Sequence, residues 1–171
     1  MTPDRIRQMA FFADLNEAEL DVLSRVLGHR KLEGLSYVFR KGDVAQHCYF
    51  VLNGEVEVLV EGADNRPKQV ASLEPGALFG EIALVDGGLR SAACRAGIGG
   101  AELAVLGREE FDRIFNAGNP FAYKLMDLIG QRVVDRVRAA AGDLLQVVLA
   151  ERALTPSYAL NSSENNGGDR G

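Results

Sequence analysis

From His29 to about Leu106 the sequence alternates short apolar runs with glycine-rich turns, and this pattern restricts the fold more than any other feature of the chain. Val56, Val58 and Val60 alternate with acidic residues, which indicates a strand with one buried face and one exposed face. Short strands at regular spacing are typical of an antiparallel β-roll or jelly roll. Helices do not alternate with these strands, so the pattern argues against a parallel nucleotide-binding sheet. We therefore expect a mainly β fold with flanking helices.

The turns of this region define the strands that we expect. Asn53-Gly54 is the strongest two-residue hairpin signal in the chain, so we predict that the strand over Tyr49–Leu52 turns back there. Gly99-Gly100 predicts a second pair of strands, over 92–98 and 102–106. Two further short strands are expected at Tyr37–Phe39 and Gln69–Leu73.

Helical patterns precede and follow the β region. Thr2-Pro3 predicts the cap and first residue of a short helix. Asn16, with Glu19 three residues later, is a capping-box signal for a second helix. After the strands, we expect a short helix over Arg108–Phe115 and a long helix that begins at Asn119-Pro120.

The long helix carries an apolar stripe that a small roll cannot cover along its whole length. The stripe consists of Leu125, Ile129, Val133, Val137, Ala141, Leu144 and Val148. We interpret its second half as a seam with a partner helix, which predicts a homodimer through residues 120–150. The alternative is a helix that folds back onto its own domain.

Length and charge bound the remaining possibilities. The 171 residues suit one domain over 1–150, followed by a short extension and a disordered polar tail over 151–171. A net charge of −5 gives no general attraction to DNA or to an anionic membrane, and no apolar run approaches the roughly 20 residues that span a bilayer. The N-terminus shows no signal-peptide pattern, so we expect a cytoplasmic protein.

The cysteines and histidines offer little chemistry of their own. Cys48 and Cys94 lie far apart in apolar surroundings and are interpreted as buried, reduced thiols. His29 and His47 show no metal-ligand spacing, so no metal site is expected. A metal enzyme on a jelly-roll scaffold would need a cluster of histidines and carboxylates inside the barrel. We therefore expect no catalytic residues.

Phe79-Gly80-Glu81-Ile82-Ala83-Leu84, followed by Arg90-Ser91-Ala92, contains the parts of a compact anion site. Gly80 has no Cβ and lets a ligand approach the main chain. The residues after it can form a helical turn whose free N–H groups attract phosphate, and Arg90 adds a charged fork that suits two phosphate oxygens. Because a carboxylate repels phosphate, Glu81 is better placed to accept hydrogen bonds from sugar hydroxyls. The pattern predicts a ligand with one phosphate and a ribose edge.

At these residues the sequence resembles the cyclic nucleotide-binding domain family, which includes bacterial proteins like the catabolite activator protein and the regulatory subunits of protein kinase A. The two segments are similar to that family's phosphate-binding cassette nearly position for position, and the likeness runs from Phe11 to Gly142. The resemblance implies a β-roll with N-terminal helices and a long C-terminal helix. It also implies cAMP or cGMP as the ligand, with no further cofactor.

The same resemblance implies a role for each residue of the cassette. Glu81 takes the ribose 2′-hydroxyl, and Arg90 takes the cyclic phosphate together with Ser91 and backbone amides. The other predicted ligand-binding residues of the two segments are Phe79, Gly80, Ile82, Ala83 and Ala92. The chain departs from the commonest pattern at Leu89, where a proline often precedes the arginine.

A residue of the C-terminal helix often caps the purine in this family, which implies a position near Arg132, Arg136 and Val137. Of these, Arg136 can stack on the base or donate a hydrogen bond to it. The alternative is a surface arginine beside Asp135.

Taken singly, the cassette residues also have simpler interpretations. Glu81 can serve a helical turn without a ligand, Arg90 can be a solvated loop arginine, and Ser91 can be a structural turn hydroxyl.

Two functions follow as hypotheses. The first is a non-catalytic receptor that transmits cyclic nucleotide binding through its C-terminal helix to a dimer or to an unknown protein partner. The second is a dimerisation or interaction module on the same fold with no ligand. Bacterial members of the family often carry a helix-turn-helix after this helix, but only about twenty residues follow Ala150. We therefore expect no direct DNA binding.

Overall fold

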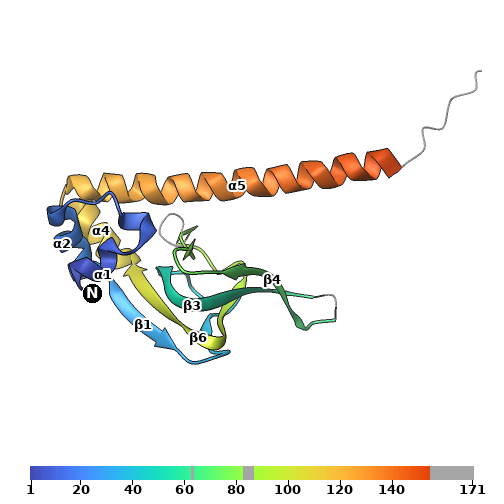
Figure 1. Cartoon of the computed structure of the whole chain (residues 1–171), viewed down its shortest axis with the longest axis horizontal. Coiled ribbons are helices and arrows are strands. Elements are labelled where there is room, and N and C mark those ends of the chain that lie inside the picture. The colour runs from blue at the N-terminus through green and yellow to red at the C-terminus, as the bar shows by residue number, and fades with distance from the viewer. Residues whose placement is uncertain (63, 83–86, 155–171) are drawn as a thin grey trace, which may run out of the picture. The chain divides into compact units, whose positions relative to one another are not determined.

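The computed structural model describes residues 1–62, 64–82 and 87–154, and describes side chains as far as Asp143 (Figure 1). In chain order its elements are α1 (Pro3–Arg7), η1 (Ala10–Phe12), α2 (Glu17–Val26), β1 (Gly28–Leu32), β2 (Tyr37–Phe39), β3 (His47–Glu61), β4 (Pro67–Leu73), β5 (Leu78–Phe79), β6 (Ala93–Gly107), α4 (Arg108–Asn116) and α5 (Pro120–Leu154). Met1–Val133 form one compact unit, and the chain from Val134 onward belongs to a second. None of the described helices is both long enough and apolar enough to span a membrane.

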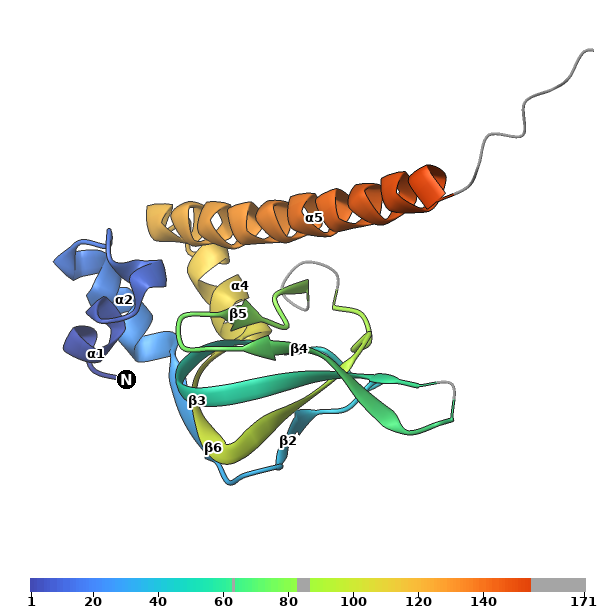
Figure 2. The same ribbon diagram turned by 45° about the vertical axis from the view of Figure 1, so that its right-hand side comes forward.

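The strands of the described residues pair antiparallel throughout and form one six-stranded sheet with the central order β1-β6-β3-β4. The short strands β2 and β5 join this path, β2 on β6 and β5 on β3. Figure 2 shows the two long strands, β3 and β6, curving side by side through the roll. The predicted fold class, a mainly β roll with N-terminal helices and a long C-terminal helix, is confirmed.

Both predicted hairpins are wrong, because β3 and β6 each continue through the dipeptide that was expected to form a turn. Asn53-Gly54 lies inside β3 and Gly99-Gly100 inside β6, and the register between the strands shifts next to Gly54. Gly54 has φ +75° and Gly100 has φ +83°, so both residues use the left-handed conformation to form irregularities rather than turns. A Cβ on Gly54 would lie 2.2 Å from the Gly100 carbonyl oxygen. The glycines therefore allow two strands to pass closely where they bend.

The predicted alternation of Val56, Val58 and Val60 also fails at its end. Val56 is fully buried, but Val60 is exposed, and its neighbour Leu59 is buried instead. The pairing of β3 with β4 shifts register between Val58 and Leu59. An irregularity of this kind moves the following side chains to the opposite face of the sheet.

The helical predictions hold closely in the first unit. Thr2 precedes α1, with Pro3 as its first residue, and Asn16 and Glu19 form both hydrogen bonds of the capping box. The Asn119 side chain accepts a hydrogen bond from the Phe121 N–H at the start of α5. Of the predicted stripe, Leu125 and Ile129 are buried.

The rest of the stripe, from Val137 onward, lies in the second unit, so the homodimer seam stays a prediction. The side chains of Leu144 and Val148, and the predicted tail after Leu154, lie outside the described residues.

Two clusters of buried side chains form the core. One lies among the β strands and contains Leu32, Val38, Tyr49, Val51, Val56, Phe79, Cys94, Ala96, Ala101 and Leu103. The other joins the N-terminal helices, α4 and the first turns of α5 to Cys48, Phe50 and Leu78 of the sheet. Leu78 immediately precedes Phe79, the first residue of the predicted cassette, so the segment leading into that cassette packs in the same core as α5.

Glu102 in β6 lies beside Arg5, His29 and Lys31. Its carboxylate accepts a hydrogen bond from Arg5 and lies 3.5 Å from His29 Nε2 and 4.0 Å from Lys31 Nζ. The hydrogen bond from Arg5 lowers the pKa of Glu102 below its ordinary 4.5; partial burial opposes this, and His29 adds to it. The carboxylate is therefore stabilised in its charged form.

This lowered pKa predicts a pH-dependent contribution to stability. The contribution is fully present above the ordinary pKa of 4.5 and is lost as the pH falls below it, because the folded state then has to take up a proton that the unfolded state already holds. We expect Glu102→Gln to unfold at a lower urea concentration than wild type at pH 7, and the difference to shrink below pH 4.5. Glu61→Gln, in the exposed pair with Lys41, is the control and should change little. A difference between wild type and Glu102→Gln that stays constant down to pH 3 contradicts this account.

Candidate functional site

The predicted cassette begins where β5 leaves the sheet. Phe79 pairs with Tyr49 of β3, and the chain then turns at Gly80, which has φ +70°. A Cβ at Gly80 would lie 2.7 Å from Arg90 Nη1 and 3.3 Å from the His47 carbonyl oxygen. The backbone conformation therefore favours glycine here, and a larger residue would also have to displace the Arg90 guanidinium.

Arg90 is buried, with 7% of its surface exposed, and the surrounding backbone fixes its orientation. Nη1 donates a hydrogen bond to the Gly80 carbonyl oxygen at 3.1 Å, and Nη2 donates to the His47 carbonyl oxygen at 2.6 Å. The guanidinium carbon lies 4.0 Å from the centroid of the Phe39 ring, within cation–π range. The prediction that Arg90 and Gly80 belong to one site is consistent with this geometry, and a solvated loop arginine is not.

The Nε atom of Arg90 is buried as well, and within the described residues it has no hydrogen-bond partner. A buried N–H of a charged group without an acceptor is costly, and most such groups in proteins are satisfied. An arginine held in this way has a donor left for an anion. This chemistry matches the predicted phosphate contact.

Among the residues whose side chains the structure describes, Glu81 is the other buried charged residue, with 3% of its surface exposed. Its charge and that of Arg90 both act on the Cys48 thiol. Burial raises the pKa of Cys48 to about 12, the charge of Glu81 adds to this, and the charge of Arg90 opposes it. Both predicted ligand-binding charges are therefore near enough to this buried thiol to influence its pKa. A cysteine with so high a pKa is unreactive at neutral pH.

Aromatic side chains from three strands support this site, and only one of them, Phe79, was predicted to belong to it. The Tyr49 and Phe79 rings stack with their centroids 5.1 Å apart, and Phe39 lies 5.7 Å from Tyr49 and 6.0 Å from Phe79. Burial raises the pKa of Tyr49, although the nearby charge of Arg90 opposes this. Phe39 and Tyr49 belong to the site because they contact Arg90. Their aromatic character in neighbouring strands was the only signal in the sequence.

The segment before Arg90 is held by backbone contacts where the commonest family pattern has a proline. Leu89 forms an isolated β-bridge with Val44. The Arg90 N–H donates to the Asp43 carbonyl oxygen at 2.9 Å, and the Ala45 N–H donates to the Gly88 carbonyl oxygen at 3.0 Å. These contacts orient Arg90 without the restriction that a proline would impose.

The structure says less about the remaining predicted ligand-binding residues. Ile82 is 54% exposed at the start of the expected helical turn, while Ala83 and the rest of that turn lie outside the described residues. Ser91 is exposed and Ala92 is half-buried, both directly after Arg90. Arg136 lies in the second unit, so its predicted contact with the base stays a prediction. Over the described ranges, no three histidine, cysteine, aspartate or glutamate residues are grouped as metal ligands would be.

The sequence around this site is similar to that of known proteins. The family model described as the cyclic nucleotide-binding domain matches residues 29–117, which includes both segments of the cassette. The chain is 30% identical over 122 residues to the cyclic AMP receptor protein of Thermus thermophilus, an alignment that covers 71% of this chain and 56% of that protein. It is 29% identical over 109 residues to a cAMP-dependent protein kinase regulatory subunit of Emericella nidulans, covering 64% of this chain and 26% of that protein.

The chain thus spans about half of the first relative and about a quarter of the second. Among solved structures, a cyclic nucleotide-binding domain from Methylobacillus flagellatus has a TM-score of 0.72 at 22% identity, covering 85% of this chain and 81% of that one. That similarity shows the shared fold.

Proposed function

Because the chain belongs to the cyclic nucleotide-binding domain family, we propose that it is a receptor for cAMP or cGMP, in which Arg90 binds the cyclic phosphate and Glu81 binds the ribose 2′-hydroxyl. The observation that carries this proposal is the burial of two charged side chains beside Gly80: Glu81 follows it in the sequence, and Arg90 donates a hydrogen bond to its carbonyl oxygen. Arg90 is 7% exposed and Glu81 is 3% exposed, and Arg90 still has a buried Nε donor without a partner in the described part of the chain. A fold that only served dimerisation would gain nothing from burying these two charges, since burial of a charge is costly.

The proposed roles follow from the chemistry of each group. A cyclic phosphate carries one negative charge and offers oxygen acceptors, which a buried guanidinium binds through charge-assisted hydrogen bonds. A carboxylate accepts hydrogen bonds but repels phosphate, so Glu81 suits the hydroxyl edge of the ribose. In this proposal Ser91, backbone amides and the Phe79 to Ala83 segment complete the phosphate-binding surface, and Arg136 contacts the base.

In this proposal the core cluster next to the cassette transmits ligand binding to the helices. Leu78, directly before the cassette, packs in the same cluster as Phe121, Leu125 and Ile129 of α5. In this proposal an inward movement of the cassette repositions α4 and α5, and the moved α5 alters a homodimer or the surface that a partner protein contacts. A ligand can drive such a change only by its difference in affinity for the two arrangements.

The role of Glu81 can be tested by removing either side of its proposed contact. We expect wild type to bind 2′-deoxy-cAMP about tenfold or more weakly than cAMP, because a hydrogen bond to a charged group contributes roughly 1.5–3 kcal/mol. Glu81→Ala should bind both ligands with the same reduced affinity, since the partner of the hydroxyl is gone. Competition against a fluorescent cyclic nucleotide measures all four affinities. Equal binding of both ligands by wild type would remove Glu81 from the proposed site.

A further inference from the structure

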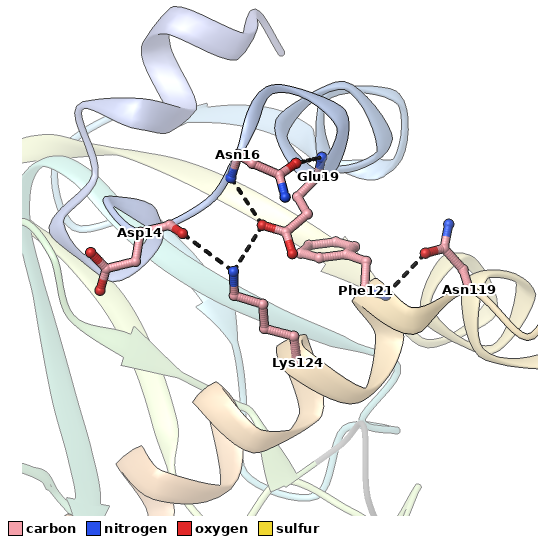
Figure 3. A network of polar contacts seen from close by, with 6 residues as sticks. All are labelled: Asp14, Asn16, Glu19, Asn119, Phe121 and Lys124. Atoms are coloured by element: carbon pink, nitrogen blue, oxygen red, sulfur yellow. Dashed lines mark hydrogen bonds and ion pairs between the residues drawn. The ribbon is translucent and has the colours of Figure 1, made fainter.

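A network of polar contacts ties the second turn of α5 to the cap of α2 (Figure 3). Lys124 Nζ lies 2.8 Å from Glu19 Oε2 and donates a hydrogen bond to the Asp14 carbonyl oxygen at 3.2 Å. These residues are more than one hundred positions apart in the sequence, so the contacts join the two ends of the first unit. The Lys124 side chain is 39% exposed and that of Glu19 is 17% exposed, which makes the pair partly shielded from solvent.

Glu19 serves two partners with the same carboxylate oxygen. Oε2 also accepts a hydrogen bond from the Asn16 N–H at 2.9 Å, while the Asn16 side chain accepts from the Glu19 N–H at 3.0 Å. Burial alone raises the pKa of Glu19, but the hydrogen bonds from Lys124 and from the Asn16 N–H outweigh it and leave the pKa lowered. Glu19 is therefore charged at neutral pH, and Lys124 binds a helix cap that is already complete without it.

The helix that Lys124 holds also contributes side chains to the core cluster that contains Leu78. Phe121, Leu125 and Ile129 of α5 are buried in one cluster with Leu78, which immediately precedes Phe79. The guanidinium carbon of Arg132, two turns beyond Lys124, lies 5.6 Å from the centroid of the Phe11 ring. On the first turns of α5, charged residues therefore contact the N-terminal segment while apolar residues contact the core that leads to Gly80.

We propose that the Lys124–Glu19 ion pair is a latch that holds α5 against the N-terminal helices and opposes its repositioning when the cassette binds a cyclic nucleotide. This inference rests on the proposed function, because it assigns a regulatory role to a contact outside the ligand site. An ion pair that belongs to only one of two arrangements biases the equilibrium toward that arrangement. The apparent affinity for a ligand that favours the other arrangement is then the intrinsic affinity multiplied by the fraction of molecules already in that arrangement. Lys124 is thus a positioning residue, and its loss tightens binding.

Lys124→Met removes the charge and keeps a chain of similar length, so its packing stays close to that of wild type. We expect this variant to bind cAMP or cGMP about two- to fivefold more tightly than wild type, which is the range of one partly exposed ion pair. We expect its melting temperature without nucleotide to fall slightly, because a stabilising contact is lost. Tighter binding together with lower stability distinguishes a latch from a purely structural contact, which would lower stability and leave affinity unchanged or weaker.

Glu19→Gln provides an independent second variant, because glutamine can accept the hydrogen bond from the Asn16 N–H and keeps the capping box. It should tighten binding in the same direction, and the double variant should add little to either single change. Arg25→Met is the matched control, because Arg25 pairs with Asp21 on α2 at 2.7 Å and that pair lies within a single helix. Its affinity should equal that of wild type.

Calorimetric titration of the full chain with cAMP and cGMP, together with thermal melting of each variant, gives all these results. Unchanged or weaker binding by both Lys124→Met and Glu19→Gln would overturn the latch and leave the proposed function standing. If wild type bound neither nucleotide, the proposed function itself would be overturned, and the latch with it.

Discussion

Arg90→Ala is expected to weaken binding of the cyclic nucleotide by about 30-fold to several-thousand-fold, which corresponds to roughly 2–5 kcal/mol. The loss is large because Arg90 is the buried cation of the site, 7% exposed, and in the proposed complex its removal leaves the phosphate charge buried without its partner. The overall fold should persist, since the core clusters do not depend on this side chain. Calorimetry gives the affinity, and circular dichroism checks the fold.

Because Arg90 also donates to the Gly80 and His47 carbonyl oxygens, the variant should melt at a somewhat lower temperature. Arg40→Ala is the matched control. Its guanidinium stacks over the Tyr37 ring at 3.8 Å, so this variant also removes an arginine from an aromatic face, but one without contacts to Gly80. We expect Arg40→Ala to bind like wild type. Wild-type affinity in a folded Arg90→Ala protein would show that the phosphate does not bind there.

Gly54→Ala should be the most destabilising of the small substitutions, lowering the free energy of unfolding by at least about 3 kcal/mol. Two costs combine at this position. Alanine has to adopt φ +75°, and its Cβ would lie 2.2 Å from the Gly100 carbonyl oxygen in the adjacent strand. Backbone atoms cannot move aside as the end of a flexible side chain can. Denaturant unfolding monitored by circular dichroism measures the effect.

Gly42→Ala separates these two costs. Gly42 has a similar φ of +86°, but a Cβ there would meet nothing within 4 Å. Only the backbone penalty remains, and we expect a loss of about 1 kcal/mol. If Gly54→Ala were no more destabilising than Gly42→Ala, Gly54 would behave as an open turn, and the continuous strand through it would be contradicted.

Local signals with a direct physical mechanism predicted their elements well. The Asn16–Glu19 capping box and the cap at Asn119-Pro120 depend only on residues a few positions apart, and both are present in the structure. The contact between Arg90 and Gly80 was predictable for a similar reason, because ten positions separate them in the sequence. The short segment that contains both residues was therefore enough to predict that they lie together, while their role in binding a ligand stays a prediction.

Asn53-Gly54 shows why other features were not predictable. A positive φ is equally useful in a hairpin turn and in an irregular strand, and the choice between them is made by the partner strand. That partner, β6, lies more than forty residues further along the chain. The aromatic rings of Phe39 and Tyr49 around Arg90, and the contact of Lys124 with Glu19, likewise depend on residues brought together only by the fold.

Equilibrium titration of the wild-type protein with cAMP and with cGMP tests the central claim most directly. We predict saturable binding of one nucleotide per chain for at least one of the two, and much weaker binding of 5′-AMP, which lacks the cyclic phosphate. The absence of saturable binding of both cyclic nucleotides up to millimolar concentration, by a protein shown to be folded, would contradict the assignment of Arg90 and Glu81 to a cyclic nucleotide site.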